Sequence, residues 1–201
     1  MSLADKIGNS FATVVEMLQD RKAIDDADVE ALTGLKRREL EAFTNRNTPI
    51  FNIDVGTKVR IIYYLGKFQK NDFKPFVDPE KDPKFDLYLV VMAEKLTTNH
   101  MKEIAKLEKE QPGMTVQFFD LKEVSFNITK HVLVPKHEVI DDETEIAEIV
   151  KTYQVKTKHQ FPLILRTDPV AKYYGMKPGN LVRITRVSPS AGEYFLYRCC
   201  V

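Results

Sequence analysis

Apolar residues recur every three or four positions near the start of the chain. The members of this stripe are Ile7, Phe11, Val14, Val15 and Leu18. They fall on one side of a helix with about 3.6 residues per turn, so the pattern predicts an amphipathic helix packed against a core. Asp25, Asp26 and Asp28 can then cap a second helical region that carries Val29 and Leu32.

Beyond residue 50 the pattern becomes that of β-strands. Val55 and residues 58–65 are rich in β-branched and aromatic side chains, which favour strands. Residues 86–93 include a continuous apolar run, typical of a strand buried on both faces. A helical pattern over residues 97–110 and a further strand pattern over 115–119 follow. The order strand, helix, strand predicts a βαβ-like unit in an α/β domain.

The last third of the chain carries a new set of elements. Asp141 is placed to cap a helix with Glu143 and Glu145 in its first turn, where the helix dipole favours carboxylates. Residues 181–187 and 194–200 have strand patterns and are separated by a short segment rich in turn-forming residues. The chain is therefore expected to end in a β-hairpin.

A short helix is predicted between these elements. Asp168 followed by Pro169 is typical of a capped helix start, and Gly175 is placed where the helix should end. The whole pattern predicts an α+β or α/β protein of two domains. Residues 1–128 would form a small sheet with flanking helices, and residues 129–201 a small mixed α/β domain that ends in the hairpin.

Composition favours a folded protein that stays in solution inside the cell. Of 201 residues, 43% are hydrophobic and 29% are charged, as in ordinary globular domains. The longest apolar runs are far shorter than the ~20 residues that a membrane helix needs. Charges at Asp5, Lys6 and Glu16 interrupt the N-terminal segment, so we expect no secretory signal and no membrane association.

The formal net charge of +1 conceals a gradient along the chain. Residues 151–201 hold 9 Lys and Arg against 2 Asp and Glu. An excess of this size suggests that the partner is a phosphate backbone or an acidic protein surface. A solvated basic face with no partner is the alternative.

Catalytic and metal-binding motifs are missing from the sequence. The two cysteines, Cys199 and Cys200, are adjacent and would point to opposite faces of a strand, and the four histidines are scattered. Glycine-rich nucleotide loops and nucleophile elbows are also lacking. We therefore expect no catalytic residue, no metal and no cofactor.

One enzyme class is a remote alternative. Asp86 opens the apolar run, and Glu94 and Lys95 end it, which loosely resembles the acidic residues and lysine of metal-dependent nucleases. That set needs its last carboxylate and lysine one residue apart, on the same strand face. Here they are adjacent and would diverge.

The pattern of residues 131–201 resembles a known family. The matching positions comprise Leu133, Val134, Pro135, Lys136, His137, Gln160, Pro162, Ile164, Asp168, Pro169, Val170, Ala171, Tyr173, Gly175, Gly179, Val182, Arg186, Ser188, Gly192, Tyr194, Tyr197 and Arg198. They are similar to the C-terminal domain of the fifth subunit shared by eukaryotic RNA polymerases I, II and III. In archaeal RNA polymerase, the counterpart of this domain is a complete small subunit.

The first 128 residues resemble the jaw domain of the eukaryotic subunit less densely. Residues 14–21 are similar to its first helix, 86–104 to its buried strand, loop and helix, and 127–129 to its junction with the second domain. Where the family usually has Thr-Pro-Ser-Ala before a helix, this chain has Thr-Thr-Asn-His at 97–100. Such departures suggest a divergent eukaryote, or a large DNA virus that encodes its own polymerase.

The resemblance implies a non-catalytic polymerase subunit, located in the nucleus, or in a cytoplasmic viral factory or virion if the source is viral. Its C-terminal domain would dock on the largest subunit among other core subunits, and its jaw would contact downstream duplex DNA through phosphates. The alternative is a free-standing nucleic-acid-binding module. The expected docking residues are Asp168, Pro169, Tyr173, Tyr174, Arg186 and Arg198. The expected DNA contacts are Thr97, Thr98, Asn99 and Lys102.

Overall fold

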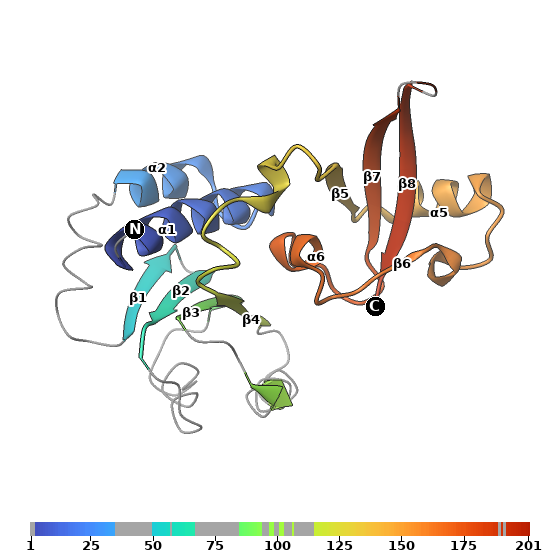
Figure 1. Cartoon of the computed structure of the whole chain (residues 1–201). Coiled ribbons are helices and arrows are strands. Elements are labelled where there is room, and N and C mark those ends of the chain that lie inside the picture. The colour runs from blue at the N-terminus through green and yellow to red at the C-terminus, as the bar shows by residue number, and fades with distance from the viewer. Residues whose placement is uncertain are drawn as a thin grey trace. The chain divides into compact units, whose positions relative to one another are not determined.

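The computed structural model describes residues 3–34, 50–56, 58–66, 85–93, 97–98, 101–102, 106, 115–188, 190 and 192–201. The chain divides into two compact units, Met1–Phe126 and Asn127–Val201. Each unit contains its own four-stranded mixed sheet with helices (Figure 1). The fold is therefore α+β, and the chain ends in a pair of antiparallel strands, as the sequence predicts.

The first unit begins with two helices. Helix α1 spans Leu3–Asp20 and helix α2 spans Asp26–Gly34. All five apolar residues of the predicted stripe are buried in α1, and Leu32 is buried in α2. The N–H of Asp28 donates to the carboxylate of Asp25 over 2.8 Å, so Asp25 caps the second helix as expected.

The sheet of the first unit has the order β1-β2-β3-β4. Its strands are β1 (Ile50–Val55), β2 (Val59–Tyr64), β3 (Leu87–Met92) and β4 (Thr115–Asp120). β1 runs antiparallel to β2, whereas β3 is parallel to both β2 and β4. The apolar run at 86–93 thus becomes a central strand with parallel neighbours, which is where continuous apolar runs are expected. The predicted helix over residues 97–110 lies partly outside the described residues, but Thr98, Met101, Lys102 and Lys106 are helical.

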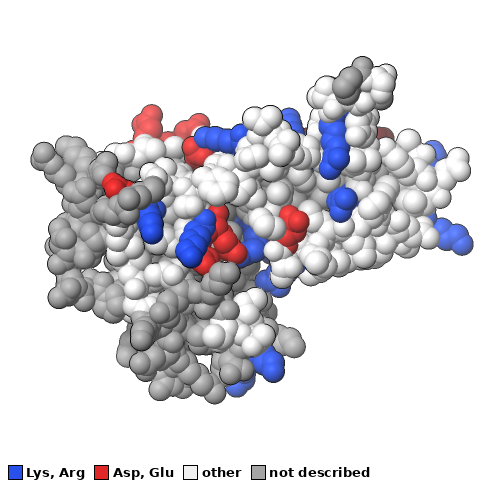
Figure 2. Space-filling view, in the orientation of Figure 1, with Lys and Arg blue, Asp and Glu red and all other residues white. Residues whose placement is uncertain are grey.

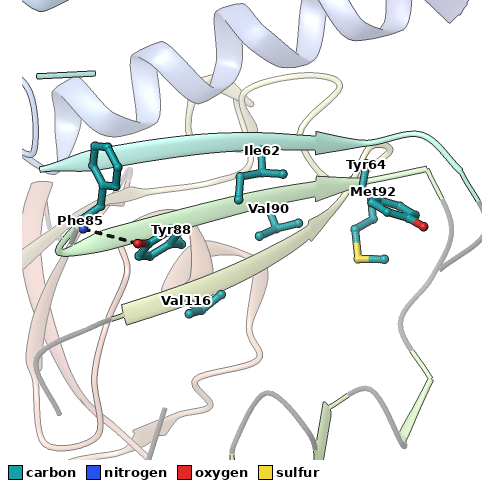
Figure 3. Close-up of a cluster of buried hydrophobic side chains, with 7 residues drawn as sticks. All are labelled: Ile62, Tyr64, Phe85, Tyr88, Val90, Met92 and Val116. Atoms are coloured by element: carbon teal, nitrogen blue, oxygen red, sulfur yellow. Dashed lines mark hydrogen bonds between the residues drawn. The ribbon is translucent and has the colours of Figure 1, made fainter. Parts of the chain in front are cut away.

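Each face of this sheet carries its own buried layer. On one face a cluster gathers side chains from β2, β3 and β4 (Figure 3). Its members are Ile62, Tyr64, Phe85, Tyr88, Val90, Met92 and Val116. On the other face, the hydroxyl of Tyr63 lies 3.0 Å from the hydroxyl of Ser10 in α1. A buried polar pair of this kind fixes how the helix sits on the sheet.

The second unit contains the elements η2 (Ile128–Lys130), β5 (Lys136–Ile140), α5 (Glu143–Thr152), η3 (Lys158–Gln160), β6 (Leu163–Ile164), α6 (Pro169–Tyr173), β7 (Leu181–Ser188) and β8 (Gly192–Cys200). Its strands lie in the order β5-β7-β8-β6. β7 and β8 form the long antiparallel hairpin that the sequence predicts.

Helices α5 and α6 contribute to two separate buried clusters of this unit. One cluster includes Ile149 of α5 together with Leu181 and Cys199. The other includes Ala171 of α6 together with Cys200. The adjacent cysteines therefore divide between the two clusters, as strand alternation predicts.

One predicted cap is wrong by a single residue. The carboxylate of Asp142, not that of Asp141, accepts the N–H of Thr144 over 2.9 Å at the start of α5. Asp141 directly follows β5, one position too early for its side chain to reach the first turn. Glu143 and Glu145 do lie in that turn. In the part of the chain that is described, no helix has the length and apolar character needed to cross a bilayer.

Candidate docking and nucleic-acid interfaces

Helix α6 is short and fixed at both ends. The carboxylate of Asp168 accepts the N–H of Val170 over 2.8 Å and that of Ala171 over 3.4 Å, and Pro169 occupies the first turn. Gly175 follows the helix with a φ of 63°, a conformation that suits glycine at a helix end. These contacts confirm the predicted start and end, and they give the helix a defined orientation.

The two tyrosines at the end of α6 occupy different environments. Tyr173 is 4% exposed, and its hydroxyl oxygen accepts a 2.9 Å hydrogen bond from the side-chain amide of Asn127. Tyr174 is half-buried and packs against the cluster that contains Cys200. The two rings meet edge to face, with centroids 5.2 Å apart and planes at 78°. Tyr173 thus belongs to the core, and Tyr174 retains part of its surface.

Two expected docking residues, Arg186 and Arg198, lie on the same face of the hairpin. Arg186 is paired with Tyr194, and Arg198 with Val182. Val182 belongs to the cluster around α6, and side chains on each strand alternate between faces, so both arginines lie on the α6 side of the sheet. His137 of β5 is paired with Ile184 on this face as well.

The pKa of His137 depends on three of the expected docking residues as well as on burial. Burial lowers the pKa of His137, although the Nδ1 contact with the carbonyl oxygen of Pro135, at 2.7 Å, acts in the opposite direction. The charge of Asp168 raises this pKa, whereas those of Arg186 and Arg198 lower it. The charges of Asp168, Arg186 and Arg198 therefore all act on one imidazole ring.

The two arginines differ in their contacts. One Nη of Arg198 donates to the main-chain oxygen of Leu163 over 3.0 Å. The guanidinium of Arg186 is exposed and makes no hydrogen bond or ion pair with any residue that the structure describes. On the face shown in Figure 2, basic side chains lie along the hairpin among uncharged residues. A surface with this charge suits an acidic protein segment.

On the opposite face of the sheet, charged side chains of the second unit pair with one another. Arg183 of β7 donates to Glu138 over 2.9 Å and to Glu145 over 2.8 Å. Its guanidinium also lies 5.7 Å from the ring centre of Phe195. Arg183 therefore holds α5 and β5 to the hairpin, and the basic excess of the last third is not uniformly available to a partner.

The expected DNA-contact residues lie only partly within the described structure. Thr97, Thr98 and Lys102 are all exposed, while Asn99 lies outside the described residues. The N–H of Met101 donates to the carbonyl oxygen of Thr97 over 3.1 Å. This bond has the spacing of an α-helical turn, so a helix begins at this point.

In the described part of the chain, no group of three or more His, Cys, Asp or Glu residues could hold a metal ion. Asp86 is exposed, and Glu94 and Lys95 lie outside the described residues. Cys199 and Cys200 are buried free thiols, and burial raises the pKa of both.

Sequence reasoning missed one surface feature of the hairpin. Tyr194, Phe195 and Leu196 all expose more than a third of their side-chain surface. Three large apolar residues in succession on a strand must occupy both faces. Such a run in a sequence indicates a strand that does not simply turn one face to the core and the other to solvent.

Comparison with known proteins connects these features to transcription. Residues 126–200 match the family model described as RNA polymerase Rpb5, C-terminal domain. Over 195 residues the chain is 32% identical to a Dictyostelium discoideum protein named DNA-directed RNA polymerases I, II, and III subunit rpabc1, covering 94% of each chain. It is 36% identical to the Arabidopsis thaliana DNA-directed RNA polymerase subunit 5-like protein 1 over 121 residues, which cover 60% of this chain and 55% of that protein.

An archaeal relative matches a segment about as long as the second unit. The DNA-directed RNA polymerase subunit Rpo5 of Pyrococcus abyssi is 45% identical over 76 residues, which are 38% of this chain and 90% of the archaeal protein. The match to the Dictyostelium protein extends through both units. The chain thus belongs to the family of the fifth subunit shared by DNA-directed RNA polymerases I, II and III.

Proposed function

We propose that this chain is a structural, non-catalytic subunit of a multisubunit DNA-directed RNA polymerase. The observation that carries this proposal is the 32% identity to the rpabc1 subunit over 94% of both chains. The absence of catalytic motifs from the sequence agrees with it. By the same relationship to eukaryotic subunits, its place is the nucleus, or a viral factory or virion if a large DNA virus encodes it.

The second unit is the proposed docking module, and the largest polymerase subunit is its partner. Residues 126–200 match the Rpb5 C-terminal family model, and an archaeal protein that carries the name of a polymerase subunit aligns over 90% of its length with 76 residues of this chain, about the length of this unit. Asp168 and Pro169 fix α6, and Tyr173 anchors it from inside. Tyr174, Arg186 and Arg198 are then the residues that contact the partner, since each retains some exposed surface.

The first unit, residues 1–128 in the sequence-based division, is the proposed jaw beside downstream duplex DNA. Thr97, Thr98, Asn99 and Lys102 would contact phosphates, because the first N–H groups of a helix and nearby cations favour anions. The contact would position the DNA without distinguishing its sequence, since no aromatic or arginine side chain is placed at this loop to reach base edges.

Co-purification tests the proposal against a free-standing module. A tagged full chain is expressed in its own host and recovered at moderate salt. The largest polymerase subunit is expected in a one-to-one ratio, together with other core subunits. Recovery of the chain alone, or with nucleic acid but no polymerase subunit, would overturn the proposed function.

A further inference from the structure

Strand β8 has one edge that is unpaired over most of its length. β7 pairs with β8 along the whole hairpin, from Gly192 to Cys199. On the other side, β6 pairs only with Cys199 and Cys200. Within the described residues, no strand pairs with this second edge along residues 193–198.

The direction of the main-chain groups follows from two hydrogen bonds at the end of β8. The N–H of Cys199 donates to the carbonyl oxygen of Pro162 over 2.9 Å, on the β6 side. The N–H of Cys200 donates to the carbonyl oxygen of Asn180 over 2.8 Å, on the β7 side. Directions alternate along a strand in a regular antiparallel ladder, and the register of this hairpin has no interruption.

The N–H and C=O groups of Glu193, Phe195 and Tyr197 therefore point away from β7, toward the unpaired edge. Those of Tyr194, Leu196 and Arg198 point toward β7. A row of main-chain donors and acceptors at a strand edge is a template for pairing with another extended chain.

The outer part of the hairpin also exposes apolar surface. β5 reaches only as far as Thr185, so the hairpin continues beyond it as a two-stranded ribbon (Figure 1). The exposed fractions are 82% for Val187 and 37% for Tyr194 in this ribbon, and 48% for Phe195 and 39% for Leu196 next to it along β8. A bare two-stranded ribbon is only marginally stable in water, and exposed apolar surface of this kind marks an interaction site.

The charge of one face narrows the choice of partner. Arg186 lies opposite Tyr194, and Arg198 follows Leu196 by two residues, so all four side chains share a face. The fully described strands β5, β7 and β8 contribute no carboxylate to this face, because Glu138 and Glu193 alternate to the other one. A segment that covers Tyr194 and Leu196 therefore encounters two guanidinium groups.

We propose that β8 accepts an extended segment of another polymerase subunit as an additional strand along residues 193–197. The segment carries apolar side chains over Tyr194 and Leu196 and a carboxylate that pairs with Arg186 or Arg198. Its main chain bonds to Glu193, Phe195 and Tyr197. This inference rests on the proposed function, and it adds the chemistry of the partner and the mode of attachment.

A second copy of the chain is a less suitable occupant. Two β8 edges that pair antiparallel about a two-fold axis perpendicular to the sheet would place the same faces of both strands side by side. The only carboxylate of β8, Glu193, lies on the face opposite Arg198. A second β8 would therefore bring no carboxylate to the face of Arg186 and Arg198, whereas an acidic segment of a different chain would.

Hydrogen exchange at single residues tests the strand pairing directly. The full chain is exchanged both free and within the intact polymerase, then quenched and fragmented for mass spectrometry. In the free protein, the amides of Leu196 and Arg198 are expected to be protected by β7, and those of Phe195 and Tyr197 to exchange quickly. In the polymerase, Phe195 and Tyr197 should slow by about 100-fold or more, because they become hydrogen-bonded.

A pair of variants at residue 195 distinguishes the contribution of the main-chain N–H from that of the side chain. Phe195→Pro removes an N–H that points to the unpaired edge and leaves the bonds to β7 in place. Phe195→Ala removes the same ring but keeps that N–H. Both should fold, as judged by thermal unfolding. The proline variant should lose a further factor of about ten in recovered polymerase relative to the alanine variant.

The outcomes distinguish failure of the added strand from failure of the proposed function. Alternating protection, with a larger defect for proline than for alanine, supports the added strand. A polymerase that assembles while Phe195 and Tyr197 exchange as fast as in the free chain overturns the strand but leaves the proposed function intact. Protection that appears in the free chain as its concentration rises indicates self-pairing and also overturns the strand. Failure of the unaltered chain to recover any polymerase subunit overturns both.

Discussion

The side-chain amide of Asn127 donates a 2.9 Å hydrogen bond to the hydroxyl oxygen of Tyr173. The carbonyl oxygen of the same side chain accepts the N–H of Thr129 over 3.0 Å and caps η2. A single asparagine thus ties the first turn of the second unit to the end of α6. A fragment that is meant to fold independently should therefore begin at or before Asn127.

We expect the second unit to fold without the first, and fragment 127–201 to be more stable than fragment 129–201. The shorter fragment loses the cap and the bond to Tyr173, which together contribute about 1–2 kcal/mol. Urea unfolding followed by circular dichroism measures the difference. Asn127→Ala within 127–201 should reproduce most of the loss. An unfolded spectrum for 127–201 would contradict the prediction.

The cap of α6 should contribute measurably to stability. Asp168→Ala removes the acceptor for the N–H groups of Val170 and Ala171, and a lost cap costs about 1 kcal/mol. Asp168→Asn keeps an acceptor and should cost less. Asp141→Ala is the matched control, because Asp142 caps α5 instead. Equal urea midpoints for the alanine variants at 168 and 141 would show that the cap has no such role.

His137 should make the second unit less stable in mild acid. Burial lowers its pKa in the folded protein below the ~6.5 of an unfolded chain. The unfolded state therefore binds the proton more readily. The contribution of neutral His137 to stability is complete above about pH 6.5 and is lost as the pH falls below it.

The measurement is thermal unfolding of fragment 127–201 between about pH 5 and 7.5. His137→Gln should flatten the dependence near pH 6, since glutamine does not titrate there. His131→Gln is the control, because His131 is exposed in the turn before β5 and has no comparable burial. The same slope in the His137 variant and the unaltered fragment would refute the assignment.

Charge reversal on the hairpin should block assembly without unfolding the chain. Arg186 is exposed and points to the α6 side of the sheet, so Arg186→Glu should repel an acidic partner and reduce recovered polymerase about tenfold or more. Lys151→Glu makes the same change in charge at an exposed position of α5. If both variants recover polymerase equally well, Arg186 is not a docking residue.

The sequence predicts elements well where local chemistry determines them. The stripe of α1, the apolar run of β3 and the paired signals Asp168 and Pro169 all correspond to structure. β1 is less evident, because its apolar residues alternate with polar ones over only six positions that follow a turn-rich tract. The choice between Asp141 and Asp142 was also beyond sequence reasoning, since both are good caps and the end of β5 decides between them.

The candidate docking surface depends on pairing between distant segments. His137, Arg186 and Arg198 meet only because β5 and β8 both pair with β7 in a particular register. A shift of one residue in either pairing would place His137 or Arg198 on the other face. The hydrogen bond between Asn127 and Tyr173 likewise joins residues 46 positions apart, so no local pattern reveals it.

The start of the helix at Thr97 should hold downstream DNA through phosphates. Thr98 and Lys102 are both exposed, and they are separated by about one helical turn, so they can approach one anion together. Thr98→Asp with Lys102→Glu places two carboxylates where a phosphate would lie. The polymerase that contains this double variant should release downstream duplex DNA faster, and the defect should be larger at low salt than at high salt.

Lys122→Glu, which alters an exposed lysine in the turn after β4, controls for the change in charge. Dissociation of DNA is followed from assembled transcription complexes over a series of salt concentrations. If the double variant assembles normally and its complexes dissociate like those of the control at every salt concentration, this helix start does not contact DNA.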